Sequence, residues 1–181
     1  MKNSLKFIAF LFFLCLVSVT AYPQNAPASG FFKDVVADME GVKAKILQLA
    51  EAMPEEKYSW RPADGVRSVS EVYNHIGGSN YYLLSFLGDK MPEGVSEDME
   101  KSVTKKADII EFIKKSYADA EKFISTLKEA DLDKEVELPF GKFTERGVLF
   151  IVMTHGHEHL GQSIAYARTN GVVPPWSMPQ K

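Results

Sequence analysis

The sequence predicts an all-α protein, a four-helix bundle that a cleavable signal peptide precedes. Apolar residues recur at intervals of three and four along four long segments, which is the spacing of amphipathic helices. Capping residues, proline or glycine stand at the ends of these segments. Four amphipathic helices joined by connections of differing length are typical of a bundle.

The chain begins with the pattern of a secretory signal peptide over residues 1–21. Two lysines near the start supply positive charge, residues 7–17 form an unbroken apolar run, and small residues lead up to Ala21. The run is too short to remain as a membrane anchor. Cys15 lacks the small preceding residues that a lipoprotein site requires. We therefore expect cleavage near Ala21 and an exported protein, periplasmic or extracellular, with no stable membrane anchor.

The mature chain has the size of one domain. Removing residues 1–21 leaves 160 residues and takes away two lysines, so the net charge of −3 becomes −5. The single cysteine leaves with the signal peptide, which excludes a disulfide framework. The acidic balance, without a basic stripe, argues against nucleic acid as a partner. We expect a proline-containing disordered leader over residues 22–29 and the bundle over residues 30–181; a homodimer is left open.

The first helix is expected over residues 30–53, where the apolar spacing is helical and Pro54 ends the run. The second is expected over residues 69–88. Ser68 followed by Glu71 forms a capping box, which satisfies two backbone amides at a helix start. In the connector between these helices, Trp60 is expected to cover one end of the bundle.

The third helix is expected over residues 105–128, after a polar loop over residues 89–103. Thr104 is the expected N-cap. The charged segment after this helix is broken by proline and glycine, and residues 136–143 are compatible with a short hairpin or with a loop.

The fourth helix is expected over residues 145–170. Thr144 caps its start, and Gly171 is the left-handed residue that commonly follows a helix end. The apolar faces of the four helices should form the core. The predicted inward residues are Val35, Met39, Val42, Ile46, Val72, Ile76, Leu83, Ile113, Phe123, Ile124, Leu127, Val148 and Val152.

Three inward histidines are the strongest functional signal. His155 and His159 are four residues apart, so a helix places them one turn apart on the same apolar face. Two such imidazoles can bind one divalent cation, whereas the alternative is two separately hydrogen-bonded core histidines. His75, midway along the second helix, can reach the same point. His157 lies off this face and is expected to be exposed to solvent.

Several known metal motifs do not fit. The HExxH motif of zincins fails because Gly161 stands in place of the second histidine. A di-iron bundle needs glutamates three residues before its histidines, and this chain has none there. The HxxEH pattern matches residues 155–159 but lacks a clear third ligand.

A family resemblance adds to this reading. The segment WRPADGVRSV at residues 60–69, the three histidines, and the downstream Gly161-Gln162, Asn170-Gly171 and Pro174-Pro175-Trp176 together resemble the DinB-like superfamily. The resemblance implies an up-down-down-up bundle and a divalent metal, zinc or nickel, held by three histidines. Carried over to this chain, those ligands are His75, His155 and His159. Many members have a second histidine just before the last ligand, and here Glu158 occupies that place.

The resemblance also implies two kinds of enzyme, metal-dependent hydrolases and thiol-dependent transferases or isomerases. An exported protein meets little low-molecular-weight thiol, which favours a hydrolase with a small-molecule substrate. Glu158 and Gln162 are the candidate orienting groups beside the metal. A non-catalytic metal-binding module is the other alternative. An open cleft at the histidines would favour an enzyme, as would an arginine nearby, but Arg168 lies about half a turn off the face of His159.

Overall fold

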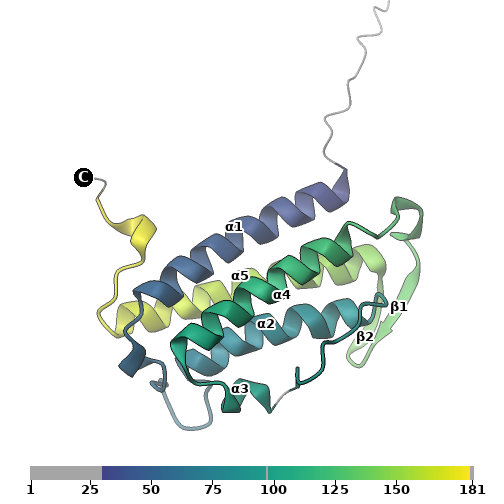
Figure 1. The fold of residues 1–181 in the computed structure, drawn as a ribbon. Helices are drawn as coiled ribbons and strands as arrows, with labels where there is room; N and C mark the ends of the chain where they lie inside the picture. Colours follow the sequence, from purple (N-terminus) through teal and green to yellow (C-terminus); the bar gives the residue numbers. More distant parts are fainter. Residues whose placement is uncertain (1–29, 97, 180–181) are drawn as a thin grey trace, which may run out of the picture.

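The structure, a computed structural model, describes residues 30–96 and 98–179. The predicted signal peptide and leader lie outside the described residues. Figure 1 shows four long helices arranged as a bundle. They are α1 (Phe31–Ala52), α2 (Val69–Ser85), α4 (Lys106–Ile124) and α5 (Glu145–Thr169). Shorter elements are α3 (Met99–Ser102) and the 3-10 turns η1 (Glu55–Lys57), η2 (Glu129–Asp131) and η3 (Pro175–Ser177).

The helices follow the up-down-down-up order. In Figure 1, α2 and α4 run in one direction and α1 and α5 run in the other. Both α1 and α2 pack against α4 and α5, so consecutive helices are mostly not neighbours. Because α2 and α4 are parallel, the chain between them must return along the bundle. The predicted polar loop over residues 89–103 makes this return and contains the short helix α3, which the sequence analysis missed.

Two of the predicted helix starts are confirmed in atomic detail. The Ser68 hydroxyl accepts a hydrogen bond of 3.3 Å from the Glu71 amide, and the Glu71 carboxylate accepts one of 2.7 Å from the Ser68 amide. At the start of α5, the Thr144 hydroxyl accepts a bond of 3.1 Å from the Gly147 amide. Gly171 has a φ of 76°, the left-handed conformation expected after this helix.

The ends of α4 differ from the prediction. Thr104 is not the N-cap, because Lys105 occupies that position and no side chain caps the helix. The helix ends at Ile124 rather than near residue 128. The hydroxyls of Ser125 and Thr126 donate to backbone carbonyls within the last turn, a local alternative to continued helix.

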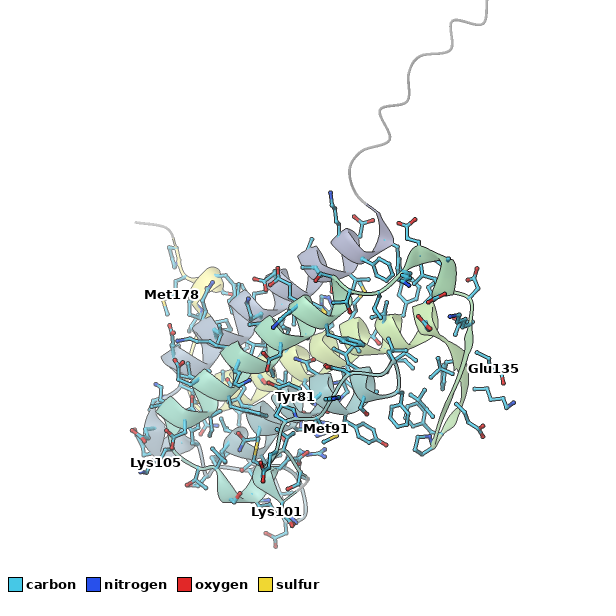
Figure 2. The ribbon with its side chains drawn as sticks, turned by 45° about the vertical axis from the view of Figure 1, so that its right-hand side comes forward. Tyr81, Met91, Lys101, Lys105, Glu135 and Met178 are labelled. Atoms are coloured by element: carbon cyan, nitrogen blue, oxygen red, sulfur yellow. The ribbon has the colours of Figure 1, made fainter. Side chains whose placement is uncertain are left out.

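Residues 136–143 belong to a hairpin rather than to a loop. Strand β1 (Glu135–Leu138) pairs with β2 (Gly141–Thr144) in antiparallel register, with Val136 opposite Phe143. Figure 2 shows Glu135 of this hairpin at the far end of the molecule from Lys101 and Lys105. The hairpin is therefore remote from the α3 end.

The predicted core is almost wholly confirmed. The structure buries eleven of the thirteen predicted inward residues, and the other two, Phe123 and Leu127, are half-buried and pack against the same core. Trp60 is half-buried, and its ring lies edge-on to Tyr166 with ring centres 5.2 Å apart. Within residues 30–96 and 98–179, the helices are too short or too polar to cross a membrane.

Candidate metal centre

His75 of α2 meets His155 and His159 of α5 where the two helices pack. The Nε2 atom of His155 lies 3.0 Å from Nε2 of His75 and 3.1 Å from Nε2 of His159. One nitrogen from each ring lies within 4.8 Å of the other two, slightly wider than the about 4 Å that ligation of one common ion requires. His159 is buried, and the other two are half-buried. We call these three residues the histidine cluster.

His157 is exposed, as predicted. Its Nε2 atom lies 3.0 Å from both carboxylate oxygens of Asp38 on the bundle surface. The side chain is 54 % exposed. His157 is two residues from each of His155 and His159, and this offset along α5 turns it to the surface while the other two point inward.

A carboxylate fixes the tautomer of His75. The Nδ1 atom of His75 lies 2.6 Å from an oxygen of Glu100. An ionised carboxylate only accepts hydrogen bonds, so Nδ1 carries the proton. The Nε2 atom of a neutral His75 therefore presents a lone pair to the histidine cluster.

A chain of three hydrogen bonds fixes the tautomer of His159. The Tyr166 hydroxyl donates to the carbonyl of Arg67 over 3.1 Å, and the Gln162 amide nitrogen donates to Tyr166 over 2.9 Å. The amide oxygen of Gln162 is thereby turned to Nδ1 of His159, 2.8 Å away. Nδ1 donates this bond, so Nε2 of His159 also presents a lone pair. Trp60 packs edge-on against Tyr166, so it lies one side chain away from this hydrogen-bond chain.

The donor set fits a cation. Nε2 of His155 faces both lone pairs, and a neutral imidazole carries a single N–H, so it can satisfy at most one of them. Burial, together with His159, His75 and Arg67, lowers the pKa of His155 to about 3. Burial also lowers the pKa of His75, against the opposing hydrogen bond to Glu100. His75 and His155 are therefore neutral at ordinary pH, which is the state that binds a metal.

Glu100 is the functional residue that sequence reasoning missed. Its carboxylate also accepts a hydrogen bond of 2.9 Å from Nε of Arg67. Burial alone would raise the pKa of Glu100, but the bonds from Arg67 and His75 outweigh it and hold the pKa below its usual value. The amide of buried Asn74 donates to the backbone carbonyls of Glu100 and Val103 and so ties α3 to α2.

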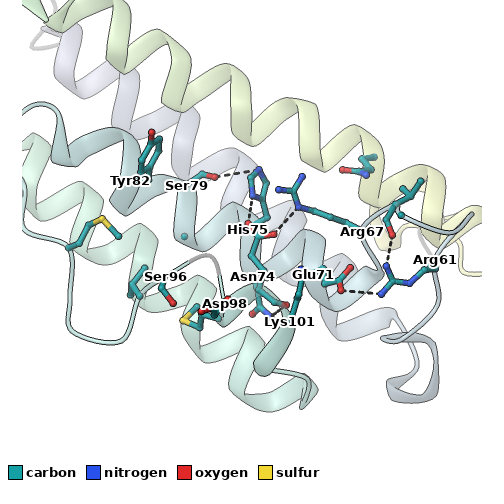
Figure 3. A pocket seen from close by; sticks show the side chains of 18 residues that line it. Arg61, Arg67, Glu71, Asn74, His75, Ser79, Tyr82, Ser96, Asp98 and Lys101 are labelled. Atoms are coloured by element: carbon teal, nitrogen blue, oxygen red, sulfur yellow. Dashed lines mark hydrogen bonds and ion pairs between the residues drawn. The ribbon is translucent and has the colours of Figure 1, made fainter. Parts of the chain in front are cut away.

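An open cleft of about 950 Å³ lies beside the cluster. Figure 3 shows its lining side chains, with Tyr82, Ser79, His75 and Arg67 following one another along one side. Of the three histidines, His75 borders the cleft, as do Glu100 and Gln162, which bind the histidine rings. The size is that of small-molecule binding sites. An open cleft is the observation that the sequence analysis named as favouring an enzyme over a sealed structural site.

Comparison with known proteins identifies the family. Residues 39–163, more than half of the chain, match the family model of the DinB superfamily. The chain belongs to the DinB superfamily. It is 28 % identical over 128 residues to the uncharacterized protein YjoA of Bacillus subtilis strain 168, a match that covers 68 % of this chain and 80 % of YjoA.

Solved structures show the same fold. The DinB-like protein from Bacillus cereus has a TM-score of 0.68 at 19 % identity, covering 78 % of this chain and 93 % of that one. YfiT from B. subtilis, described as a probable metal-dependent hydrolase with an unusual four-helix bundle topology, has a TM-score of 0.64 at 17 % identity. That match covers 83 % of this chain and 94 % of YfiT.

The other residues that the sequence suggested for this DinB-superfamily site, Gln162, Glu158 and Arg168, differ in their positions relative to the histidines and the cleft. Gln162 contacts His159, as described above. Glu158 is exposed and is not one of the residues that line the cleft, so its orienting role stays a prediction. The arginines that line the cleft are Arg61 and Arg67, from the connector before α2. The connector is not helical around these two arginines, so spacing along a helix does not place them, whereas it does place Arg168.

Proposed function

We propose that this protein is an exported metal-dependent hydrolase that holds one divalent ion, zinc or nickel, on His75, His155 and His159. The observation that carries the proposal is the convergence of three Nε2 atoms beside an open cleft, two of them with fixed lone pairs. A divalent metal on three nitrogen ligands would supply Lewis acidity and lower the pKa of a bound water to about 7. The description of YfiT, a protein with a similar fold, supports the reaction class.

The surrounding residues would hold this centre in shape. Glu100 and Gln162 accept hydrogen bonds from the outer nitrogens of His75 and His159 and fix the ring orientations. The Ser79 hydroxyl lies 3.5 Å from Nε2 of His75 and lines the cleft, where it can donate to a substrate oxygen. The helices α2 and α5 keep the ligands in place, because both are packed into the core.

Metal analysis tests the ligand set. Protein from the native secretory route, purified without chelator, should carry about one zinc or nickel ion per chain by inductively coupled plasma mass spectrometry. His75→Ala, His155→Ala or His159→Ala should each lose most of the metal. His157→Ala is the matched control on the same helix and should keep it. A wild-type protein that takes up no metal, or ligand variants that retain it, would refute the centre.

Two further measurements test the reaction and the export. A screen of esters, amides and thiol acceptors should give turnover with an ester or amide that disappears in His155→Ala; turnover only with a thiol would favour the transferase alternative. N-terminal sequencing of protein from the cell envelope or medium should start near Tyr22. An intact Met1 on a cytoplasmic protein would refute export.

A further inference from the structure

Arg67 carries two donors that the protein itself does not use. Its Nε atom binds Glu100 over 2.9 Å, but within residues 30–96 and 98–179 its two terminal nitrogens have no hydrogen-bond partner. The side chain is 43 % exposed and lines the cleft. Figure 3 shows its guanidinium turned toward the His75 ring. A fixed guanidinium with two open donors is the group that best matches a carboxylate.

The neighbouring arginine is different. Arg61 donates to the carbonyl of Val66 over 2.7 Å and to the carboxylate of Glu71 over 3.0 Å. Its guanidinium is therefore occupied at both ends. Of these two arginines, Arg67 is the one able to receive a ligand.

The charges of the cleft favour an anion once a metal is bound. Among the described residues that line the cleft, Arg61, Arg67 and Lys101 supply three positive charges, and Glu71, Asp98 and Glu100 supply three negative ones. These described charges balance one another, and a divalent ion on the histidine cluster would add two positive charges beside Arg67. A ligand carboxylate between the metal ion and Arg67 would reduce this excess of positive charge and accept charge-assisted hydrogen bonds from the guanidinium.

Beyond Ser79, on the side of His75 away from Arg67, the cleft is lined by the aromatic ring of Tyr82 (Figure 3). Tyr82 and Met91 line the cleft, and these two large apolar side chains are 42 % and 41 % exposed, so both are accessible to a ligand. In Figure 3, Tyr82 and Arg67 lie on opposite sides of His75. A ligand that spans the cleft would place one end at the Arg67 guanidinium, its middle at His75, and its other end at Tyr82 and Met91.

We infer that the substrate is a small carboxylate with an apolar body, and that Arg67 binds the carboxylate while the bond to be cleaved lies over His75. The inference rests on the proposed function for the reaction, but the binding role of Arg67 can be tested separately. Tyr82 and Met91 would receive the apolar end.

Calorimetric titration with two matched ligands tests this inference. The probes are 3-phenylpropionate and its neutral counterpart 3-phenylpropan-1-ol, titrated into zinc-loaded and into metal-free protein. Zinc-loaded wild type should bind the acid at least about tenfold more tightly than the alcohol. Arg67→Gln should remove most of that preference, Arg67→Lys should keep part of it, and Arg61→Gln should keep it.

Two readouts separate this inference from the metal proposal. Zinc content and thermal unfolding are measured for every variant, so loss of the centre or of the fold is recognised directly. If wild type takes up no zinc, the proposed function fails. The role of Arg67 is then decided on metal-free protein, where wild type should prefer the acid over the alcohol and Arg67→Gln should lose that preference. Tyr82→Ala should weaken both ligands to a similar degree. Equal binding of acid and alcohol by wild type, no measurable binding of either, or an unchanged preference in Arg67→Gln would overturn the inference.

Discussion

Glu100 shows how one side chain can set the chemistry of another. By accepting the Nδ1 proton of His75, it leaves the Nε2 lone pair facing the cluster. A carboxylate in this role also makes the ring a stronger metal ligand. Its second bond, to Arg67, links the metal centre to the residue that we expect to bind substrate.

Replacing this carboxylate tests its role. Glu100→Gln keeps the size of the side chain but removes the charge, so it should weaken metal affinity about 10- to 100-fold. Competition with a chromophoric chelator measures the change. Glu93→Gln, an exposed position in the same return segment, is the control and should leave affinity unchanged. Equal affinities in the two variants would contradict the role given to Glu100.

The depressed pKa of His155 predicts how the metal-free protein responds to acid. The pKa falls from the ordinary 6.5 to about 3 on folding, so the unfolded chain binds more protons between these values. The contribution of this residue to stability is complete above pH 6.5 and is lost as pH falls toward 3. Urea unfolding of chelator-treated protein should therefore show free energies of unfolding that drop more steeply from pH 6.5 to 4.5 in wild type than in His155→Ala. Parallel pH profiles would show that the pKa of His155 is close to normal.

The histidines were predictable and Glu100 was not, for a physical reason. His155 and His159 lie within one helix, where spacing alone defines the shared face. Glu100 lies 25 positions after His75, beyond the end of α2 and after an irregular stretch of the return segment. Its position depends on the path of the return segment, and no local periodicity describes that path.

Among the elements, α2 and α4 approach closely at a glycine. A Cβ atom on Gly77 would lie 2.6 Å from the Phe112 ring, whereas a Cβ on the adjacent Gly78 would meet nothing within 4 Å. The two glycines share the same helix and nearly the same intrinsic propensity, so they form a matched pair.

Alanine substitution at the two positions should give different results. Gly78→Ala should stabilise the protein by about 0.5–1 kcal/mol, the usual helix preference of alanine over glycine. Gly77→Ala gains the same preference but must displace Phe112, so it should be at least about 1 kcal/mol less stable than Gly78→Ala. Urea denaturation measures both. Equal stabilities would mean that the Phe112 ring moves aside without cost.

Helices with strong signals at both ends were the best predicted elements. The capping box at Ser68 and the glycine after α5 act through bonds between near neighbours, so they are visible in the sequence. The start of α4 has no side-chain cap, and threonine before it was a misleading signal. The four-residue helix α3 is too short to show a period, and the amide of Asn74 on another element fastens it.

At the scale of the molecule, the proposed metal would join two helices from distant parts of the chain. His75 lies on α2 and the other two ligands lie on α5, so binding would favour the folded state over the unfolded chain. Free metal at 100 times its dissociation constant should add about 2.7 kcal/mol. For a chain of this size that corresponds to a rise in melting temperature of roughly 5–10 °C.

Differential scanning calorimetry with and without chelator measures this rise. Chelator should lower the melting temperature of metal-loaded wild type, and added zinc should restore it. His155→Ala should show no such shift, because it lacks the central ligand. If neither chelator nor zinc changes the melting temperature of the wild type, the proposal that a metal bridges α2 and α5 is contradicted.

The return segment between α2 and α4 supplies much of the cleft lining, whereas α2 and α5 supply the three histidines. Seven of the cleft residues come from this segment: Met91, Val95, Ser96, Asp98, Met99, Glu100 and Lys101. None of the described residues between α2 and α4 is among the fully buried ones. Apart from Glu100, which binds His75, and the Glu100 and Val103 carbonyls that Asn74 binds, the side chains of this segment can change without disturbing the packed helices that carry the histidines. The fold thus joins a fixed histidine cluster to a variable wall, and relatives with the same bundle could accept different molecules by altering this one stretch of chain.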